Sequence, residues 1–105
     1  MREERLLSSL KGACLGSKYR VSSTELELAL NLSGTDLRKL VNQLRRKGVP
    51  IASDRQGYFY AATAGEVYTT IHQLRQMVNG LEKAIAGLED SLDNFGEVDS
   101  GGDTL

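Results

Sequence analysis

The sequence has little of what cofactor sites, disulfides and membrane segments require. It contains one cysteine, Cys14, one histidine, His72, one proline and no tryptophan. A lone cysteine cannot form an internal disulfide, and one Cys with one His supplies too few ligands for zinc. No apolar run approaches the roughly 20 residues that span a membrane, and the N-terminus lacks the apolar stretch of a secretory signal. We therefore expect a cytoplasmic protein without metal, other cofactor or membrane contact.

The residue sets that support catalysis are also missing. The chain has no Ser–His–Asp set, and its glycines do not form a phosphate-binding loop. Acidic residues in the C-terminal third belong to a predicted exposed helix, where we expect them to be solvated. We therefore expect a protein that is not an enzyme.

Charge is distributed unevenly along the 105 residues. Residues 34–60 hold six Lys or Arg against two Asp or Glu, whereas residues 61–105 hold two against eight. A chain of this length forms one small domain with an appendage. The basic centre and the acidic C-terminal third therefore predict two segments with different tasks.

A six-residue pattern occurs twice, as VSSTEL at residues 21–26 and as LSGTDL at residues 32–37. Each copy is typical of a helix start, in which a serine hydroxyl caps backbone N–H groups and an acid three residues later can reach back. The expected N-caps are Ser22 and Ser33. The apolar residues at the two ends of each pattern can pack together as a hydrophobic staple.

The spacing of the two patterns predicts a helix-turn-helix. Two starts eleven residues apart leave room only for a short first helix, over about residues 23–30. Its inward-facing residues are expected to be Leu26, Ala29 and Leu30. The second helix is expected to end just before Gly48. A short helix, a tight turn and a longer capped helix form the helix-turn-helix motif.

The second helix separates apolar from polar side chains. Its core-facing positions recur at helical spacing and are Leu37, Leu40, Val41 and Leu44. The opposite face and its flanks hold side chains that can bind base edges, namely Thr35, Arg38, Lys39, Asn42 and Gln43. The end of the helix holds expected phosphate contacts at Arg45, Arg46 and Lys47. Taken alone, such a basic run is more typical of a solvated helix end.

A β-hairpin is predicted over residues 51–60. The segment DRQG at residues 54–57 has the preference of a type I turn, and the aromatic residues after it favour a strand. Among these aromatic residues, Phe59 alternates outward and is expected to be the most exposed. Arg55 and Gln56 lie at the tip of the turn, where we expect them to bind DNA.

An N-terminal helix, the helix pair and the hairpin together predict a winged helix. The stretch from SSTEL to GYFYA is similar to the winged-helix DNA-binding domain of the biotin-operon repressor type, above all in GVPI and GYFY. The resemblance covers about residues 5–61 and implies a bacterial or prophage regulator. It places Thr35, Arg38, Lys39 and Asn42 on the recognition helix, and Arg55 and Gln56 on the wing. The ligase and biotin-binding regions of that repressor have no counterpart here, so no biotin chemistry is implied.

Residues 64–94 contain no proline and have an unbroken apolar heptad pattern. The apolar seam consists of Val67, Ile71, Leu74, Val78, Leu81, Ile85, Leu88 and Leu92. Leaving it exposed would cost about 1.5–3 kcal/mol for each large side chain, so we expect it to pair with a second copy. Read as heptads, position a holds Ile71, Val78, Ile85 and Leu92, and position d holds Val67, Leu74, Leu81 and Leu88. β-branched residues at a with Leu at d favour a parallel pair. An antiparallel pair centred near Glu82 would bring Arg75 towards Glu89 of the other chain, and both orientations stay open.

These segments predict a mainly helical α+β chain. A winged helix-turn-helix occupies residues 1–62, a coiled-coil dimerisation helix residues 63–94, and a disordered acidic tail residues 95–105. The leading hypothesis is a homodimeric transcriptional regulator with residues 33–47 in the major groove of double-stranded DNA and the wing, residues 51–60, on the backbone or minor groove. The alternative is a protein-interaction adaptor whose coiled coil binds a different chain.

Overall fold

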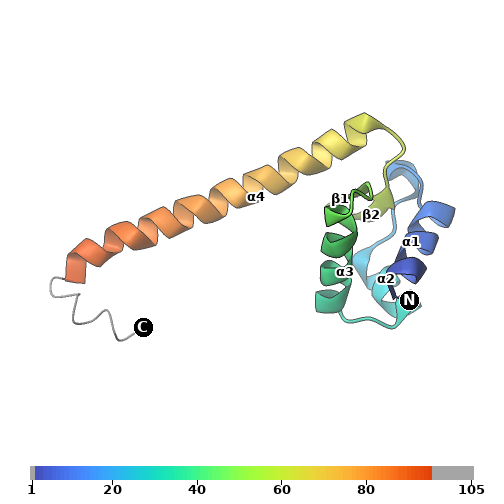
Figure 1. Cartoon of the computed structure of the whole chain (residues 1–105), viewed down its shortest axis with the longest axis horizontal. Helices are drawn as coiled ribbons and strands as arrows, with labels where there is room; N and C mark the ends of the chain where they lie inside the picture. The colour runs from blue at the N-terminus through green and yellow to red at the C-terminus, as the bar shows by residue number, and fades with distance from the viewer. Residues whose placement is uncertain (1, 96–105) are drawn as a thin grey trace. The chain divides into compact units, whose positions relative to one another are not determined.

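A computed structural model describes residues 2–95 of the chain (Figure 1). It confirms a mainly helical protein with a small antiparallel hairpin and a long C-terminal helix. The elements are α1 (Arg2–Ala13), the 3₁₀ helix η1 (Ser17–Tyr19), α2 (Ser23–Leu30), α3 (Gly34–Arg46), β1 (Ile51–Asp54), β2 (Gly57–Tyr60), α4 (Ala64–Ser91) and the 3₁₀ helix η2 (Leu92–Phe95). The predicted disordered tail lies outside the described residues, apart from Phe95 in η2. The chain divides into two compact units after Ile71, so the first unit includes the first two turns of α4.

The two predicted helix starts are confirmed. At α2 the Ser22 hydroxyl accepts from the Glu25 N–H at 3.1 Å, and the Glu25 carboxylate accepts from the Ser22 N–H at 3.3 Å. At α3 the Ser33 hydroxyl accepts from the Asp36 N–H at 3.1 Å. The shorter Asp36 side chain does not complete a capping box and instead lies 3.2 Å from Arg2 on α1. These caps fix where both helices begin.

The turn between α2 and α3 is as tight as the spacing predicts. Asn31 ends α2 in the left-handed conformation with a φ of 55°, which asparagine tolerates better than most residues. The next helix begins three residues later at Gly34. This short connection sets the angle at which α3 leaves α2.

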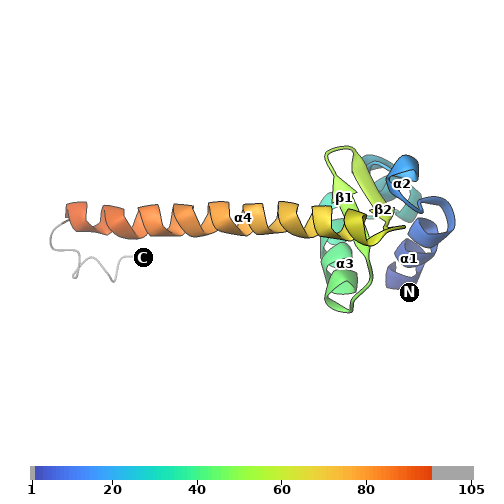
Figure 2. The same ribbon diagram turned by 90° about the horizontal axis from the view of Figure 1, so that it is seen from above.

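The core of the first unit lies between the three short helices and the hairpin, which gather together in two views (Figure 1, Figure 2). The four predicted core positions of α3 are all buried, as are Leu6 and Leu10 of α1. Ala29 was predicted to face inward with Leu26 and Leu30, and this is wrong. Its side chain is exposed and lines an open groove beside Ser9 of α1, because the small alanine does not reach across that groove.

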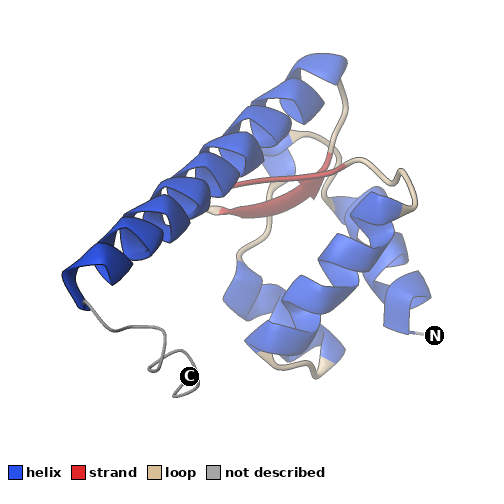
Figure 3. Cartoon of the chain, turned by 60° about the vertical axis from the view of Figure 1, so that its left-hand side comes forward, coloured by secondary structure: helices blue, strands red, loops and turns tan. Residues whose placement is uncertain are grey.

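The two strands form an antiparallel hairpin, drawn in red in Figure 3. Its register pairs Ile51 with Tyr60 and Ala52 with Phe59. Phe59 is only 4% exposed, so the prediction that it faces outward is wrong. In this register Phe59 shares its buried face with Ala52, and Tyr58 and Tyr60 alternate to the other face, where they are half-buried.

A backbone ladder joins β2 to the segment before α2. The Val21 N–H donates to the Tyr58 carbonyl at 2.9 Å, and the Tyr58 N–H donates to the Val21 carbonyl at 2.8 Å. The close approach requires glycine at position 57, because a Cβ there would collide with the Val21 carbonyl oxygen. Strand β2 is therefore held on both edges, and the hairpin has a fixed position beside the helix pair.

Candidate nucleic-acid interface

The outward face of α3 is the most distinctive polar surface of the first unit. Its exposed residues are Thr35, Arg38, Lys39, Asn42, Gln43 and Arg46, directly opposite the buried leucines. One Arg38 nitrogen lies 3.4 Å from the Thr35 hydroxyl, a weak contact that leaves the rest of the guanidinium available. The core therefore contacts one side of α3. The other side presents hydrogen-bond donors and acceptors to solvent, on side chains of different lengths.

Arg45 differs from its basic neighbours. Its Nε donates to the Ile51 carbonyl at 2.8 Å, and its Nη2 donates to the Ser53 hydroxyl at 3.1 Å. Burial lowers the pKa of the Arg45 guanidinium, although an arginine keeps its charge. The sequence suggests a phosphate contact, whereas the structure shows Arg45 bracing β1 against the end of α3.

Two ion pairs join the first turn of α1 to the two ends of α3. Arg2 pairs with Asp36 at 3.2 Å, and Glu3 pairs with Lys47 at 2.7 Å. Exposed pairs of this kind contribute little to stability, about 0–1 kcal/mol each. The Lys47 side chain remains 64% exposed, so its ammonium can exchange Glu3 for another anion.

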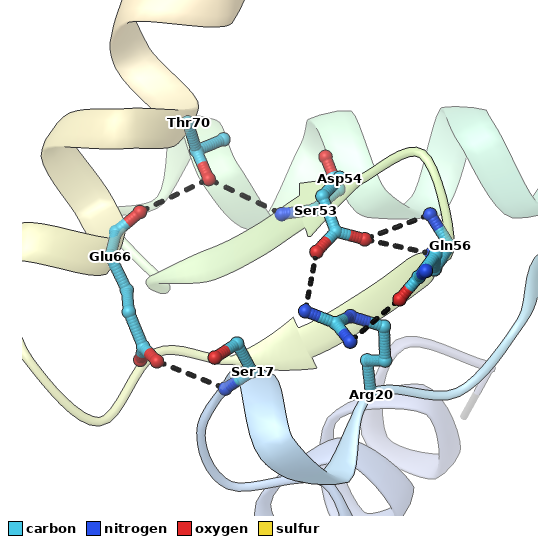
Figure 4. Close-up of polar contacts among 8 residues, drawn as sticks. Ser17, Arg20, Ser53, Asp54, Gln56, Glu66 and Thr70 are labelled. Atoms are coloured by element: carbon cyan, nitrogen blue, oxygen red, sulfur yellow. Dashed lines mark hydrogen bonds and ion pairs between the residues drawn. The ribbon is translucent and has the colours of Figure 1, made fainter.

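The hairpin turn is shaped by an arginine that sequence reasoning missed (Figure 4). Asp54 Oδ1 accepts from the backbone N–H groups of Gln56 and Gly57, at 2.9 Å and 3.1 Å. Arg20 then pairs with Asp54 Oδ2 at 2.8 Å and donates to Gln56 Oε1 at 2.7 Å. The Gln56 carboxamide oxygen is thus occupied within the chain.

Arg55 lies at the tip of this turn. Its side chain is exposed, and within residues 2–95 it makes no hydrogen bond or ion pair with another side chain. Of the two predicted tip residues, Arg55 is therefore the one whose side chain has no partner within residues 2–95.

The start of α4 is tied to the rest of the first unit by Glu66 and Thr70 (Figure 4). Glu66 accepts from the backbone N–H groups of Ser17 and Ala62, at 2.9 Å and 2.7 Å. The buried Thr70 hydroxyl accepts from the Ser53 N–H and donates to the Glu66 carbonyl, both at 3.2 Å. These contacts link α4 to η1 and β1.

Glu66 also belongs to the N-terminal cap of α4, which the sequence analysis did not identify although it placed the helix from residue 63 or 64 onward. The Thr63 hydroxyl accepts from the Glu66 N–H at 3.2 Å, the geometry of an N-cap. The residues TAGEV at 63–67 have the same Thr-to-acid spacing that marks α2 and α3. The same signal could therefore have placed the start of α4.

The stability of the first unit is expected to depend less on pH in a variant that lacks the Glu66 carboxylate. Hydrogen bonds from the backbone of Ser17, then of Ala62, hold the pKa of Glu66 below its ordinary value of 4.5. The carboxylate therefore stabilises the fold above that value, and this contribution disappears as the pH falls through the lower folded-state pKa. Glu66→Gln should lower the thermal midpoint at neutral pH, and the gap to wild type should narrow as the pH falls below 4.5. Thermal denaturation over a series of pH values measures this gap, with Glu89→Gln as the control. A gap that stays constant with pH would contradict the prediction.

The second unit presents the predicted seam to solvent. The six seam residues of this unit, from Leu74 to Leu92, are between 37% and 69% exposed. In the first unit Ile71 is 37% exposed and Val67 is half-buried. An apolar face this long is unusual for a chain that acts alone. The seam is therefore accessible over its whole length beyond the first two turns of α4.

Comparison of the chain with family models, with curated proteins and with solved structures gives no match. No helix within residues 2–95 combines the length and apolar character needed to span a bilayer. The same residues contain no group of three or more His, Cys, Asp or Glu side chains arranged to bind a metal ion.

Proposed function

We propose that the chain is a dimeric, sequence-specific DNA-binding protein, with a winged helix built from the first unit. In this proposal α3 is the recognition helix and the β1–β2 hairpin is the wing. The observation that supports it most is the outward face of α3, where cationic and amide side chains stand opposite a buried leucine face. Helices presented in this way place such side chains against base edges in the major groove.

The proposed DNA contacts fall into two groups, those with bases and those with the DNA backbone. Arg38, Lys39 and Asn42 occupy the middle of the exposed face and would bind base edges. Arg46 and Lys47, at its end, would bind phosphates, and Arg55 would bind the backbone or the adjacent minor groove. We do not assign Arg45 to phosphate binding in this proposal, because its guanidinium already donates to the Ile51 carbonyl and the Ser53 hydroxyl.

The net charge of the first unit also supports DNA binding. Residues 1–71 hold eleven Lys or Arg against seven Asp or Glu, so the first unit is basic although the whole chain has a net charge of −1. A basic unit attracts the phosphate backbone before specific contacts form. Residues 72–105 hold two Lys or Arg against seven Asp or Glu, so the excess of negative charge belongs to the other unit.

The apolar seam of α4 supports the second part of the proposal, which is that the protein is a dimer. Pairing it with another copy would bury the exposed leucines, isoleucines and valines, and it would present two recognition helices to one DNA site. The resulting dimer would act as a bacterial or prophage transcriptional regulator.

An interaction adaptor is the second candidate, and the exposed seam favours it as much as it favours a dimer. In that case α4 would bind a different protein, and the basic face of α3 would be incidental. The two candidates differ in whether the chain binds nucleic acid.

Salt-sensitive binding to mixed genomic DNA is the expected result for a regulator. If each subunit contacts about three phosphates, raising the salt from about 50 to 200 mM should weaken binding about a thousandfold. Fluorescence anisotropy with labelled fragments measures this slope, and selection from random oligonucleotides should recover an inverted repeat. Absence of DNA binding at low salt, with the seam still bound to another protein, would favour the adaptor.

A further inference from the structure

The two flanks of the α4 seam differ in chemistry. The e flank, beside the d positions, is largely charged and consists of Tyr68, Arg75, Glu82 and Glu89. The g flank, beside the a positions, has no charge and consists of Thr70, Met77, Ala84 and Ser91. In the second unit the charged side chains and Met77 are all exposed. The flanks of a seam normally decide the direction in which two helices pair.

We infer that two copies of the chain pair with their α4 helices antiparallel, with Val78 of each copy opposite Leu81 of the other. This inference rests on the dimer of the proposed function and specifies its geometry. The same register places Ile71 opposite Leu88 and Leu74 opposite Ile85 of the other copy. Every a residue thus meets a d residue, and the whole seam is buried.

Antiparallel pairing brings like flanks together. Arg75 of each copy then lies beside Glu82 of the other, which gives two symmetric pairs of opposite charge. On the opposite side Met77 lies beside Ala84 of the other copy, so the uncharged flanks bury each other. Charged and apolar groups are therefore separated onto the two sides of the pair.

Parallel pairing would mix the flanks. Each g residue would lie beside the e residue five positions further along the other chain. Met77 would then face Glu82, Ala84 would face Glu89, and no pair of opposite charge would form. Apolar side chains would be placed against carboxylates, which costs more than placing them against each other.

Neighbouring antiparallel registers are less favourable. A shift of one heptad, centred near Glu82, pairs Arg75 with Glu89 but places Glu82 against its own copy. It also leaves Val67 without an apolar partner and places Ile71 opposite Phe95, which lies in η2 beyond the end of α4. The register centred between Val78 and Leu81 is the one that satisfies both the seam and the charges.

Cysteine cross-linking tests the direction of pairing directly. Leu74→Cys and Ile85→Cys chains, each with a different affinity tag, are mixed and oxidised gently. Antiparallel pairing should give a disulfide between the two variants and almost none within either variant alone. The wild-type chain, whose single Cys14 is buried, is the control for background cross-linking. Disulfides that join Leu74→Cys chains to each other would show parallel pairing and overturn the inference.

A charge exchange provides an independent test. Arg75→Glu or Glu82→Arg alone should raise the dissociation constant of the dimer about tenfold, since each places two like-charged pairs across the interface. The double variant should return to within about twofold of wild type, because exchanged charges still face their opposites. Lys83→Glu, on the outer surface, is the control. Additive losses in the double variant would contradict the antiparallel register.

The two proposals fail in different ways. A monomeric wild-type chain by light scattering would overturn the dimer itself and, with it, the antiparallel register. A parallel cross-linking pattern would overturn only the direction of pairing, and the DNA-binding proposal would be unaffected. Loss of DNA binding with an antiparallel dimer intact would overturn the proposed function and leave the pairing standing.

Discussion

Replacing Arg38 and Lys39 together by alanine is expected to abolish the preference of the protein for its own DNA site. A well-placed contact between a side chain and a base edge contributes about 1–3 kcal/mol of discrimination. Loss of two such contacts should therefore weaken binding to the preferred site about a hundredfold. Binding to unrelated DNA should fall much less, because the other basic residues of the first unit remain.

The fold is expected to survive this double substitution. Both side chains are exposed, neither forms an ion pair within the described residues, and alanine is a strong helix former. Circular dichroism and the thermal midpoint should therefore be nearly unchanged. A loss of DNA binding would then reflect lost contacts and not an unfolded helix.

Two further double variants distinguish sequence-specific contacts with bases from non-specific binding to phosphates. Arg46→Ala with Lys47→Ala should weaken binding to all sequences by a similar factor and reduce the salt slope. Arg5→Ala with Lys18→Ala removes two exposed charges away from α3 and should leave site preference intact. The measurement is the ratio of affinities for a selected site and a scrambled one. An unchanged affinity ratio in the Arg38→Ala, Lys39→Ala variant would show that these residues of α3 do not recognise the DNA sequence.

Helix starts were predictable because their signal is local. A serine and an acid three residues apart determine where α2 and α3 begin, and both are confirmed by short side-chain to backbone hydrogen bonds. The third start, at Thr63 and Glu66, follows the same rule. The heptad pattern, and not this cap, placed that helix from residue 64 onward, and α4 does begin at Ala64.

Features that depend on distant parts of the chain could not be predicted. The inward position of Phe59 follows from the pairing of β2 with both β1 and Val21, and alternation alone allows either face. The bracing role of Arg45 requires that the end of α3 lie beside β1. Arg20 reaches the hairpin turn from 34 residues before Asp54. The residues of the candidate interface could therefore be proposed from the sequence. Which of their side chains already bind other residues of the chain could not.

Replacing Leu74 and Leu81 by aspartate is expected to convert the dimer to monomers. Four leucine side chains would leave the interface of the pair, at about 1.5 kcal/mol or more each, so the loss is at least about 6 kcal/mol. This corresponds to a rise of about 10⁴-fold in the dissociation constant, before the cost of placing carboxylates in an apolar seam is added. Both orientations of the pair predict the same result, because both bury these residues.

Gln76→Asp with Lys83→Asp is the matched control. Both positions are exposed, lie in the same helix and are seven residues apart, as Leu74 and Leu81 are, but they stand on the outer surface of the proposed pair. Light scattering should give a monomer mass for the seam variant and a dimer mass for the control, with similar helix content in both. The seam variant should still bind a single half-site weakly and lose the gain from binding two half-sites at once. A dimer mass that persists in the seam variant would show that the chains associate through another surface.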